Sequence, residues 1–531
     1  MPARRAPVTT APTAPARAGR REWMALGVLM LPVLLVSIDN TVLSFAIPQI
    51  AAALSPTAAQ QLWFVDIYTL VLASLLVTMG TLGDRVGRRR LLLLGAAGFG
   101  LASLFAAFAS TPEELIAARA LKGLFGATLM PSTLSLLRNV FLDHGQRRLA
   151  IAIWASAFSA GTALGPMVGG LMLEHFWWGS VFLLNVPLLA VLLVVGPRLL
   201  PESRRAGAGR IDLLSVVLSV GAMLPFVYGI KGLTTGGVSV AAVGALALGA
   251  VVGAVFVHRQ LRATDPLLDV RLFTVRVFSA SVVANLMSVF ALSGLLFLVS
   301  QHLQLVVGLD PIAAGLRLMP GALAAVVMGL IAVALARVAP IRLLIPAGLA
   351  LSTAGYLVGT TLTASDGGGV VVAAFVLVGA GVGLAETLTN DAILASVPPE
   401  RAGAASGISE TAYELGATLG VATLGGVLSG VYRAGVDVPS QVPDAAAASA
   451  GETLGGAVAA AAELPARYAD LLLESAREAF TTAAVGTAWI GATVTFAAAV
   501  VVAIALRSHR EEPDDGAAAQ TAPDLVTAPR A

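Results

Sequence analysis

The sequence predicts an all-α membrane protein, and three observations carry that prediction. Hydrophobic residues make up 57% of the 531 residues and charged residues only 12%, whereas a soluble domain typically carries about 25% charged residues. Apolar runs of about 18 residues or more recur along the chain, each long enough to cross a bilayer as a helix. Arginines gather in alternate connections between these runs, as the positive-inside rule requires of cytoplasmic loops.

Fourteen membrane spans are predicted. The first six lie at 24–46, 62–81, 91–109, 114–136, 151–171 and 180–197. Two more follow at 212–230 and 238–257, and the last six lie at 277–299, 311–335, 343–362, 370–394, 403–431 and 481–506. The basic start of the chain is also typical of a secretory signal, but the apolar run after it is longer than a signal core. We therefore interpret that run as the first span.

Both ends of the chain are predicted on the cytosolic side. Most of the 33 basic residues fall on that side, and the opposite side holds only Lys231, Arg433, Arg467 and Arg477. Segments 1–23 and 507–531 are expected to be cytosolic tails, the first of them disordered because it is rich in Ala, Pro and Arg. A net charge of +2 excludes the global basic field of a nucleic-acid-binding protein. The absence of cysteine excludes disulfides and Cys-based metal sites.

A weak internal repeat divides the chain. The Leu-rich stretch 91–105 with its spaced glycines is echoed by 343–358. We expect an N-terminal six-helix bundle at 24–198, a two-helix insertion at 211–258 and a C-terminal six-helix bundle at 277–506, which includes an extracytoplasmic loop at 432–480. In that loop Pro465 suits a helix start, and 471–473 could rest on the membrane surface. Two repeated halves are typical of a transporter with a central site near the membrane midplane.

A glycine-rich basic motif follows the second predicted span. Its glycines permit a tight turn and close helix approach, its aspartate can accept hydrogen bonds, and its arginines anchor the cytosolic face. A positive-inside loop without a further role would explain the arginines but not the fixed spacing of Gly, Asp and Gly. We therefore expect a gating role for Gly80, Gly83, Asp84, Arg85, Gly87 and Arg88.

The fifth predicted span carries small residues at every fourth position. Such a stripe lets another helix pack closely, and the proline within it is expected to bend the helix. Ordinary small-residue packing and a specific role in preventing leak are both compatible with this pattern. The residues are Ala157, Gly161, Gly165, Pro166 and Gly169.

These motifs resemble the signatures of the major facilitator superfamily over about residues 24–506. The motif at 80–90 resembles its cytoplasmic signature, Arg119 with Gly123 and Gly126 resembles a second one, and the glycines of the fifth span resemble the antiporter signature. Within the superfamily, the opening Asp39-Asn40-Thr41-Val42, the fourteen spans and the long loop before the last span resemble the drug:proton antiporters, and most nearly the QacA-type exporters.

The resemblance implies the major facilitator fold and proton-coupled efflux of cationic or amphiphilic compounds across a bacterial cytoplasmic membrane. The implied protein is a monomer in the lipid bilayer, driven by the proton gradient with no cofactor and no bound metal. The alternative is an exporter of one antibiotic, metabolite or lipid-like compound. A receptor or channel would not explain the paired motifs, and the motifs of ATP-driven and hydrolytic enzymes are absent from the sequence.

Ionisable residues inside spans are costly and indicate a partner or a function. Asp39, Asp66 and Arg119 lie at similar depths, about 8 to 10 Å below the outer boundary at 1.5 Å per residue. We expect them to form a proton-coupling cluster, with a static ion pair as the alternative for Arg119.

Two acids of the thirteenth span, Glu410 and Glu414, lie four residues apart and hence on one helical face. Like carboxylates in a low dielectric resist being ionised together, so one is expected to hold a proton until a cation binds. A solvated position at the cytosolic mouth is the alternative for Glu410. Glu386 of the twelfth span is an intermediate candidate, and Asp391 is expected to have no function.

Aromatic side chains in the spans offer surfaces for a cation. Core packing and interface anchoring are the alternatives for each of them. His302, with the glutamines at 301 and 304, is interpreted as a solvated cap. The expected substrate-binding residues are Glu414, Glu410, Glu386, Tyr413, Trp63 and Tyr68.

Overall fold

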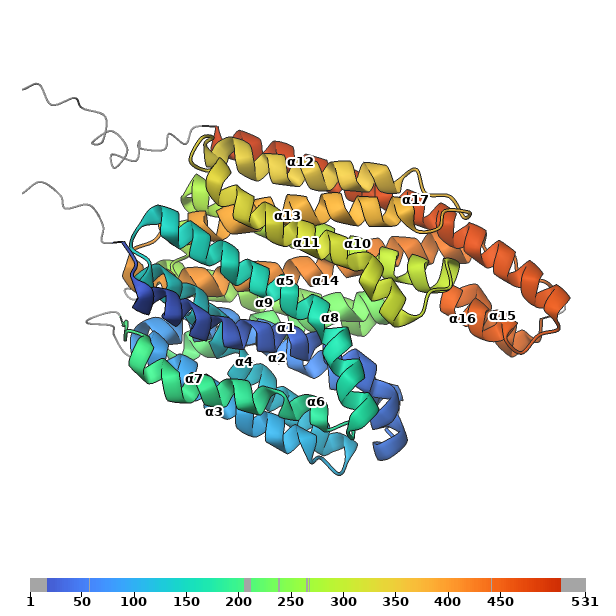
Figure 1. The fold of residues 1–531 in the computed structure, drawn as a ribbon, viewed down its shortest axis with the longest axis horizontal. Helices are drawn as coiled ribbons and strands as arrows, with labels where there is room; N and C mark the ends of the chain where they lie inside the picture. Colours follow the sequence, from blue (N-terminus) through green and yellow to red (C-terminus); the bar gives the residue numbers. More distant parts are fainter. Residues whose placement is uncertain are drawn as a thin grey trace, which may run out of the picture.

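The computed structural model describes residues 17–56, 58–204, 212–236, 239–263, 266, 268–440 and 442–507. Within these ranges all regular structure is helical (Figure 1). The predicted tails fall largely outside them. The disorder expected for 1–23 is wrong for its last part, because the first helix already begins at Arg20.

In the residues that the structure describes, the first half of the chain forms seven helices. They are α1 Arg20–Leu54, α2 Ala58–Val86, α3 Arg88–Ala107, α4 Pro112–Val140, α5 His144–His175, α6 Ser180–Leu183 and α7 Asn185–Leu199. The sixth predicted span corresponds to α6 and α7 together, which Leu184 separates.

Two helices, α8 Leu213–Gly236 and α9 Val240–Arg262, form a hairpin between the halves. The second half begins with the short helix η1 Val270–Thr274. It continues with α10 Arg276–Gln301, the π-helical turn η2 His302–Val306, α11 Pro311–Leu335, α12 Ile341–Gly359, α13 Gly369–Ala395, η3 Pro399–Arg401, α14 Ala402–Gly435, α15 Asp444–Glu452, α16 Leu454–Ala461 and α17 Ala466–Leu506.

Every predicted span overlaps helical structure, and the sixth span overlaps two successive helices. In the described part of the chain, 13 helical segments are long and apolar enough to cross a membrane. The fifth predicted span, 151–171, lies within α5, a helix of 32 residues. The chain is therefore a multi-pass membrane protein.

Side-chain caps explain where several of these helices begin. Thr111 accepts a hydrogen bond from the backbone N–H of Glu114 and starts α4. Asp143 accepts from the backbone N–H of Gln146 and starts α5, and Asp310 caps α11 in the same way. Such caps satisfy backbone donors that the first turn of a helix leaves unpaired.

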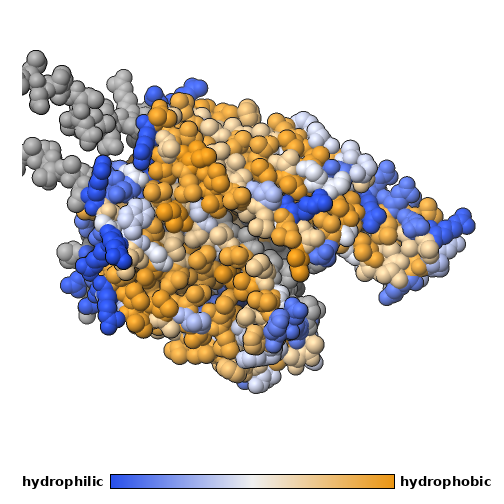
Figure 2. All heavy atoms as spheres, viewed as in Figure 1, coloured by the Kyte–Doolittle hydropathy of each residue, from blue (hydrophilic) through white to orange (hydrophobic). Residues whose placement is uncertain are grey.

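The start of α1 and the end of α17 lie at the same end of the bundle (Figure 1). We call this the terminal end. Contacts between the halves are made by α2 with α14 and by α5 with α11, while α8 packs against both α2 and α14. On the face in Figure 2, a broad apolar band is bounded by hydrophilic side chains at the terminal end and around α15 and α16.

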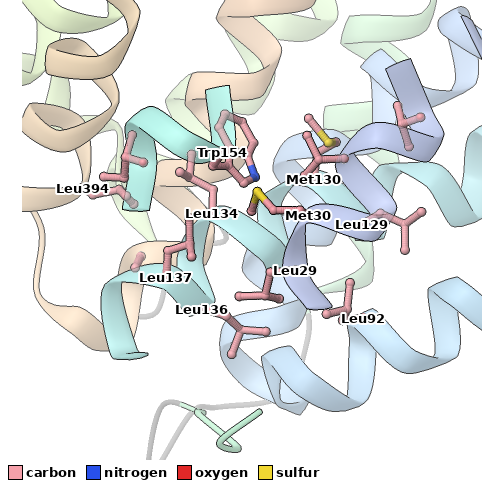
Figure 3. Close-up of a cluster of buried hydrophobic side chains, with 14 of the residues drawn as sticks. Leu29, Met30, Leu92, Leu129, Met130, Leu134, Leu136, Leu137, Trp154 and Leu394 are labelled. Atoms are coloured by element: carbon pink, nitrogen blue, oxygen red, sulfur yellow. The ribbon is translucent and has the colours of Figure 1, made fainter. Parts of the chain in front are cut away.

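One hydrophobic cluster joins the two halves near the terminal end. Figure 3 shows Leu134 and Leu137 of α4 and Trp154 of α5 beside Leu394 of α13, all buried. The indole nitrogen of Trp154 donates to the hydroxyl of Thr133 at 3.1 Å. Trp154 is therefore a core residue, which is one of the alternatives considered for the aromatic side chains. The halves share an apolar core at this end.

The segment expected as an extracytoplasmic loop folds into α15, α16 and an extension of α17. Pro465 precedes α17, as expected. The extension does not lie apart on a membrane surface, because α17 continues without a break from Ala466 to Leu506. Leu472, Ala476 and Phe480 are buried in one cluster with residues of α15 and α16. The solvated cap expected at His302 is also wrong, because its ring is fully buried and stacks on Phe480.

Candidate functional site: a buried charge cluster, an acidic group and an interdomain gate

Asp39 of α1 lies at the centre of a buried charge cluster. Its Oδ2 accepts a hydrogen bond of 3.0 Å from Nη1 of Arg119. Its Oδ1 accepts hydrogen bonds from Nζ of Lys122 and, at 2.9 Å, from Nδ2 of Asn185. The side chain of Asp39 is 3% exposed and those of its two basic partners are 1% or less. One acid thus faces two bases away from solvent, where their charges interact strongly.

Two members of this cluster were not anticipated from the sequence. Lys122 follows Arg119 by three positions and therefore lies on the same face of α4. Its ammonium nitrogen also lies 4.8 Å and 4.7 Å from the ring centroids of Phe99 and Phe182, a geometry in which aromatic rings favour a cation. A lysine inside a predicted span was the signal that could have identified it. Asn185 gave no such signal.

Of the expected proton-coupling cluster, the structure brings Asp39 and Arg119 together, while their part in proton coupling stays a prediction. The remaining hydrogen bond of Arg119 runs from Nε to the carbonyl oxygen of Phe64, at 2.9 Å. Asp66 is only partly buried, and the network around Asp39 consists of the bases and Asn185. A share of Asp66 in proton coupling stays a prediction.

A second group consists of three acids in the other half. Glu386 of α13 and Glu410 of α14 are 9% and 6% exposed, and Glu414 is partly buried. Glu410 lies within electrostatic reach of both other carboxylates. The solvated position considered for Glu410 is wrong, since the side chain is buried. Among the described residues none pairs with the carboxylates of Glu386 and Glu410, so a bound proton or a cation is needed to neutralise these two acids.

Two of the three aromatic residues expected to bind substrate lie next to these charges. The ring of Tyr413 packs edge-on against Phe158 of α5, with 5.1 Å between centroids, and so bridges the two halves. Tyr68 is fully buried, with the guanidinium of Arg119 4.6 Å from its ring centroid. Trp63 is 37% exposed. The substrate-binding roles of all three stay predictions.

The carboxylate of Asp84 fastens α2 to the first turn of α14. It accepts hydrogen bonds of 2.8 Å from the backbone nitrogen of Gly403 and 2.9 Å from that of Ala404. Arg88 donates to the same carboxylate through Nε and Nη2, at 2.9 and 2.7 Å, and also to the carbonyl oxygen of Pro399 at 2.6 Å. A helix N-terminus favours an anion, so the motif closes the terminal end between the halves.

The glycines of the motif allow this contact. A side chain at Gly80 would collide with the backbone of Gly403, so the two helices can approach only where both lack a Cβ. Gly87 has a φ of +120°, which residues with side chains rarely adopt. Gly83 faces Leu91 and Arg88. Arg85 lines a small cavity of about 30 Å³ beside Asp84, so its side chain lies at the gate.

A second buried lock at the terminal end joins α5 to α13. The carboxylate of Asp391 forms ion pairs with Nε of Arg147 at 3.0 Å and with Nε of Arg148 at 2.8 Å. The Asp391 side chain is 5% exposed and that of Arg147 is 6% exposed. The interpretation of Asp391 as a residue without a function missed this interdomain ion pair, because its partners lie more than 240 positions away in the sequence.

The small-residue stripe of α5 packs against α1. Gly161 faces Ser37, Gly165 faces Thr41 and Gly169 faces Val42. At Gly165 even one methyl group would overlap the hydroxyl of Thr41. The close packing expected from the stripe is thus present within one half. The bend expected at Pro166 stays a prediction, because the side chain of Pro166 lies outside the described residues.

An apolar cavity of about 670 Å³ lies between the α8–α9 hairpin and α14. Its walls include Phe226 and Ile230 of α8, Leu246 of α9 and Leu419 of α14. No group of three or more His, Cys, Asp or Glu residues able to hold a metal ion occurs in the described part of the chain.

Sequence comparison gives relatives along most of the chain. A multidrug efflux pump, LfrA of Mycolicibacterium smegmatis, is 53% identical over 492 residues, which cover 92% of this chain and 97% of that protein. The methyl viologen resistance protein SmvA of Salmonella typhimurium is 37% identical, covering 81% and 88%. The tetracenomycin C resistance and export protein of Streptomyces glaucescens is 36% identical, covering 76% of each.

Solved structures share the fold. The human organic anion transporter MFSD10 superposes with a TM-score of 0.56 at 15% identity, covering 89% of this chain and 99% of that one. A bacterial homologue of the human lysosomal transporter Spinster, in an inward-facing and unoccupied conformation, gives 0.55 at 17% identity, covering 93% and 100%. The sequence profile of the Major Facilitator Superfamily matches residues 29–421. With this match and the close relatives, the chain belongs to the Major Facilitator Superfamily and is a transporter, not an enzyme.

Proposed function

We propose that this transporter exports cationic or amphiphilic drugs from a bacterial cell in exchange for protons. The observation that carries the proposal is the group of Glu386, Glu410 and Glu414, in which Glu386 and Glu410 are buried and have no basic partner among the described residues. Such a group attracts a cation and cannot stay fully ionised without one. The resistance and efflux proteins among the relatives support the same function.

Exchange follows from competition between the two cations. A proton held by the acidic group leaves when a drug cation favours the ionised carboxylates. The aromatic rings of Tyr413 and Phe158 border the group and offer surfaces for the apolar part of the drug. After release of the drug, protons from the opposite side reload the carboxylates. Asp39, held by Arg119 and Lys122, is the second site at which protonation changes the charge balance.

Alternating access requires that the two ends open in turn. In this conformation the terminal end is held shut by the hydrogen bonds of Asp84 of α2 to α14 and by the ion pair of Asp391 of α13 with Arg147 of α5. We assign the terminal end to the cytosol, because the arginine-rich connections lie there. On this assignment the chain spans the bacterial cytoplasmic membrane fourteen times with both termini inside, like the QacA-type exporters, and works as a monomer.

Everted membrane vesicles test the proposal. Vesicles carrying the protein are energised, and ethidium fluorescence is followed before and after a protonophore collapses the proton gradient. We expect ethidium to be concentrated inside the vesicles and to be released when the gradient collapses. Ethidium movement that is indifferent to the protonophore would refute proton coupling. Transport of tetracenomycin-like neutral compounds without ethidium would support export of a single antibiotic or metabolite instead.

A further inference from the structure

Tyr68 of α2 carries a buried hydroxyl group for which the described residues offer no hydrogen-bond partner. Buried hydroxyl groups are almost always paired, so an unpaired one calls for an explanation. Two other buried tyrosines do have hydrogen-bond partners. Tyr356 donates to the carbonyl oxygen of Ala291 at 2.7 Å, and Tyr432 donates to that of Ala450 at 2.8 Å.

The ring of Tyr68 is held along α4 by features already singled out in the sequence. The guanidinium of Arg119 lies over the ring, 4.6 Å from its centroid. A side chain at Gly123 would collide with the backbone at Tyr68, and one at Gly126 would lie 3.3 Å from the hydroxyl oxygen. The two glycines after Arg119 therefore make room for this tyrosine.

The surroundings of the hydroxyl join the two charged groups. Arg119 of α4 lies over the ring and holds Asp39 of α1, and α14, which carries Glu414, packs against α2, so the charges of all three residues act on the hydroxyl. Of the other charged groups nearby, Lys122 of α4 is bound to Asp39, and Asp66 lies on α2 itself. Phe99 packs edge-on against the ring from α3 and brings no charge. Tyr68 is thus in electrostatic reach of both the Asp39 cluster of one half and an acid of the other.

We infer that Tyr68 is a positioning residue that couples the charge cluster around Asp39 to the acidic group around Glu414. Its hydroxyl pairs with Glu414 when that carboxylate is ionised and no drug cation is bound to it. The inference rests on the proposed exchange of drug for protons. A phenol both donates and accepts a hydrogen bond, so it can serve ionised and protonated carboxylates alike. Its ring meanwhile stabilises Arg119 whenever protonation of Asp39 removes the anion from that base.

The test compares Tyr68→Phe with Tyr356→Phe in the full-length protein. Both changes remove one hydroxyl from a fully buried tyrosine and keep the ring. Thermal unfolding, binding of tetraphenylphosphonium and protons released per cation bound are measured in detergent, and proton-driven ethidium transport is measured in everted vesicles.

For Tyr68→Phe we expect an unfolding temperature no lower than that of the wild type, because an unpaired polar group has been removed. Tetraphenylphosphonium should bind within about twofold of the wild type, since the ring stays in place. Proton release per cation and ethidium transport should fall, the latter at least about tenfold, as expected for losing a hydrogen bond to a charged group. Tyr356→Phe should lower the unfolding temperature and keep the wild-type proton release.

If Tyr68→Phe releases protons and transports ethidium like the wild type, the inference about Tyr68 is overturned and the proposed exchange still stands. The inference is also overturned if Tyr68→Phe lowers the unfolding temperature as Tyr356→Phe does and weakens cation binding to a similar degree. That result would mean that Tyr68 has a structural role only. A wild-type protein that releases no protons on binding the cation would overturn the proposed exchange, and the inference with it.

Discussion

The Oδ1 atom of Asp84 accepts a hydrogen bond of 2.8 Å from the backbone nitrogen of Gly403, although 319 positions separate the two residues in the sequence. A carboxylate from one half therefore completes the N-terminus of a helix in the other half. Because the contact depends on α2 and α14 lying against each other, it exists only while the terminal end is closed.

Replacing Asp84 by asparagine should slow transport of all substrates by a similar factor. The amide keeps the size of the side chain but loses the charge that binds Arg88 and the start of α14. Uptake of ethidium and of a chemically unrelated substrate into everted vesicles measures the effect. Asp212→Asn is a suitable control, because Asp212 pairs with Arg259 away from the gate. A defect confined to one substrate would contradict the assignment to a gate.

Breaking the ion pair between Arg147 and Asp391 should destabilise the protein strongly. Removing Asp391 should cost about 3 to 5 kcal/mol, because the buried charge of Arg147 is left without compensation, whereas after Arg147→Met the carboxylate of Asp391 keeps Arg148. Thermal unfolding of Asp391→Leu, Arg147→Met and the double variant tests this, and the double variant should be more stable than Asp391→Leu alone. The exposed pair Arg433–Glu452 provides the control, with an expected effect of about 1 kcal/mol or less.

The variant Asp39→Asn should still insert into the membrane but lose proton-driven efflux. Asparagine keeps the size of the side chain and removes the titratable charge. It also leaves Lys122 and Arg119 without their anion, so the protein should be less stable. Adding Lys122→Gln should restore part of the stability without restoring efflux. Ethidium efflux at the wild-type rate in Asp39→Asn would eliminate the proton-coupling role of this residue.

Glu410→Gln and Glu414→Gln should each reduce the number of protons released when a cation binds. Removing one carboxylate relieves the like-charge repulsion on the other. The remaining carboxylate is then ionised more readily and holds a proton less often at neutral pH. Proton release from purified protein on addition of tetraphenylphosphonium is the measurement. Glu452→Gln, at an exposed position, should leave the release unchanged. If both variants release as many protons as the wild type, coupling lies elsewhere, with Asp39 and Asp66 the next candidates.

Gly165→Ala and Gly170→Ala should have opposite effects on stability. The methyl group at position 165 would overlap Thr41, whereas position 170 has open space around it. Overpacking of this kind costs about 1 to 3 kcal/mol, while alanine in place of an unconstrained helical glycine stabilises by roughly 0.5 to 1 kcal/mol. Thermal unfolding of the two variants checks the difference. Equal stability of the two would mean that α1 and α5 do not pack closely along this stripe.

Hydrophobic patterning alone determined that this protein spans a membrane many times. Backbone groups in lipid must bond within their own segment, so length and apolarity identify a spanning helix without knowledge of its neighbours. Spacing along one helix is equally local, so the stripe of α5 and the shared face of Glu410 and Glu414 could be predicted. The depth estimate also brought Asp39 and Arg119 to one level, where the structure pairs them at 3.0 Å.

Which faces meet across helices was decided only by the tertiary structure. Hydropathy does not encode helix rotation or the pairing of distant segments, so it could not show that Asn185 and Lys122 join Asp39, Arg147 joins Asp391, or Gly403 joins Asp84. The same holds for burial: Glu410 and His302 were each compatible with a solvated end, and packing of neighbouring helices buries both. Side-chain charge is local to a residue, but its partner is a property of the assembled bundle.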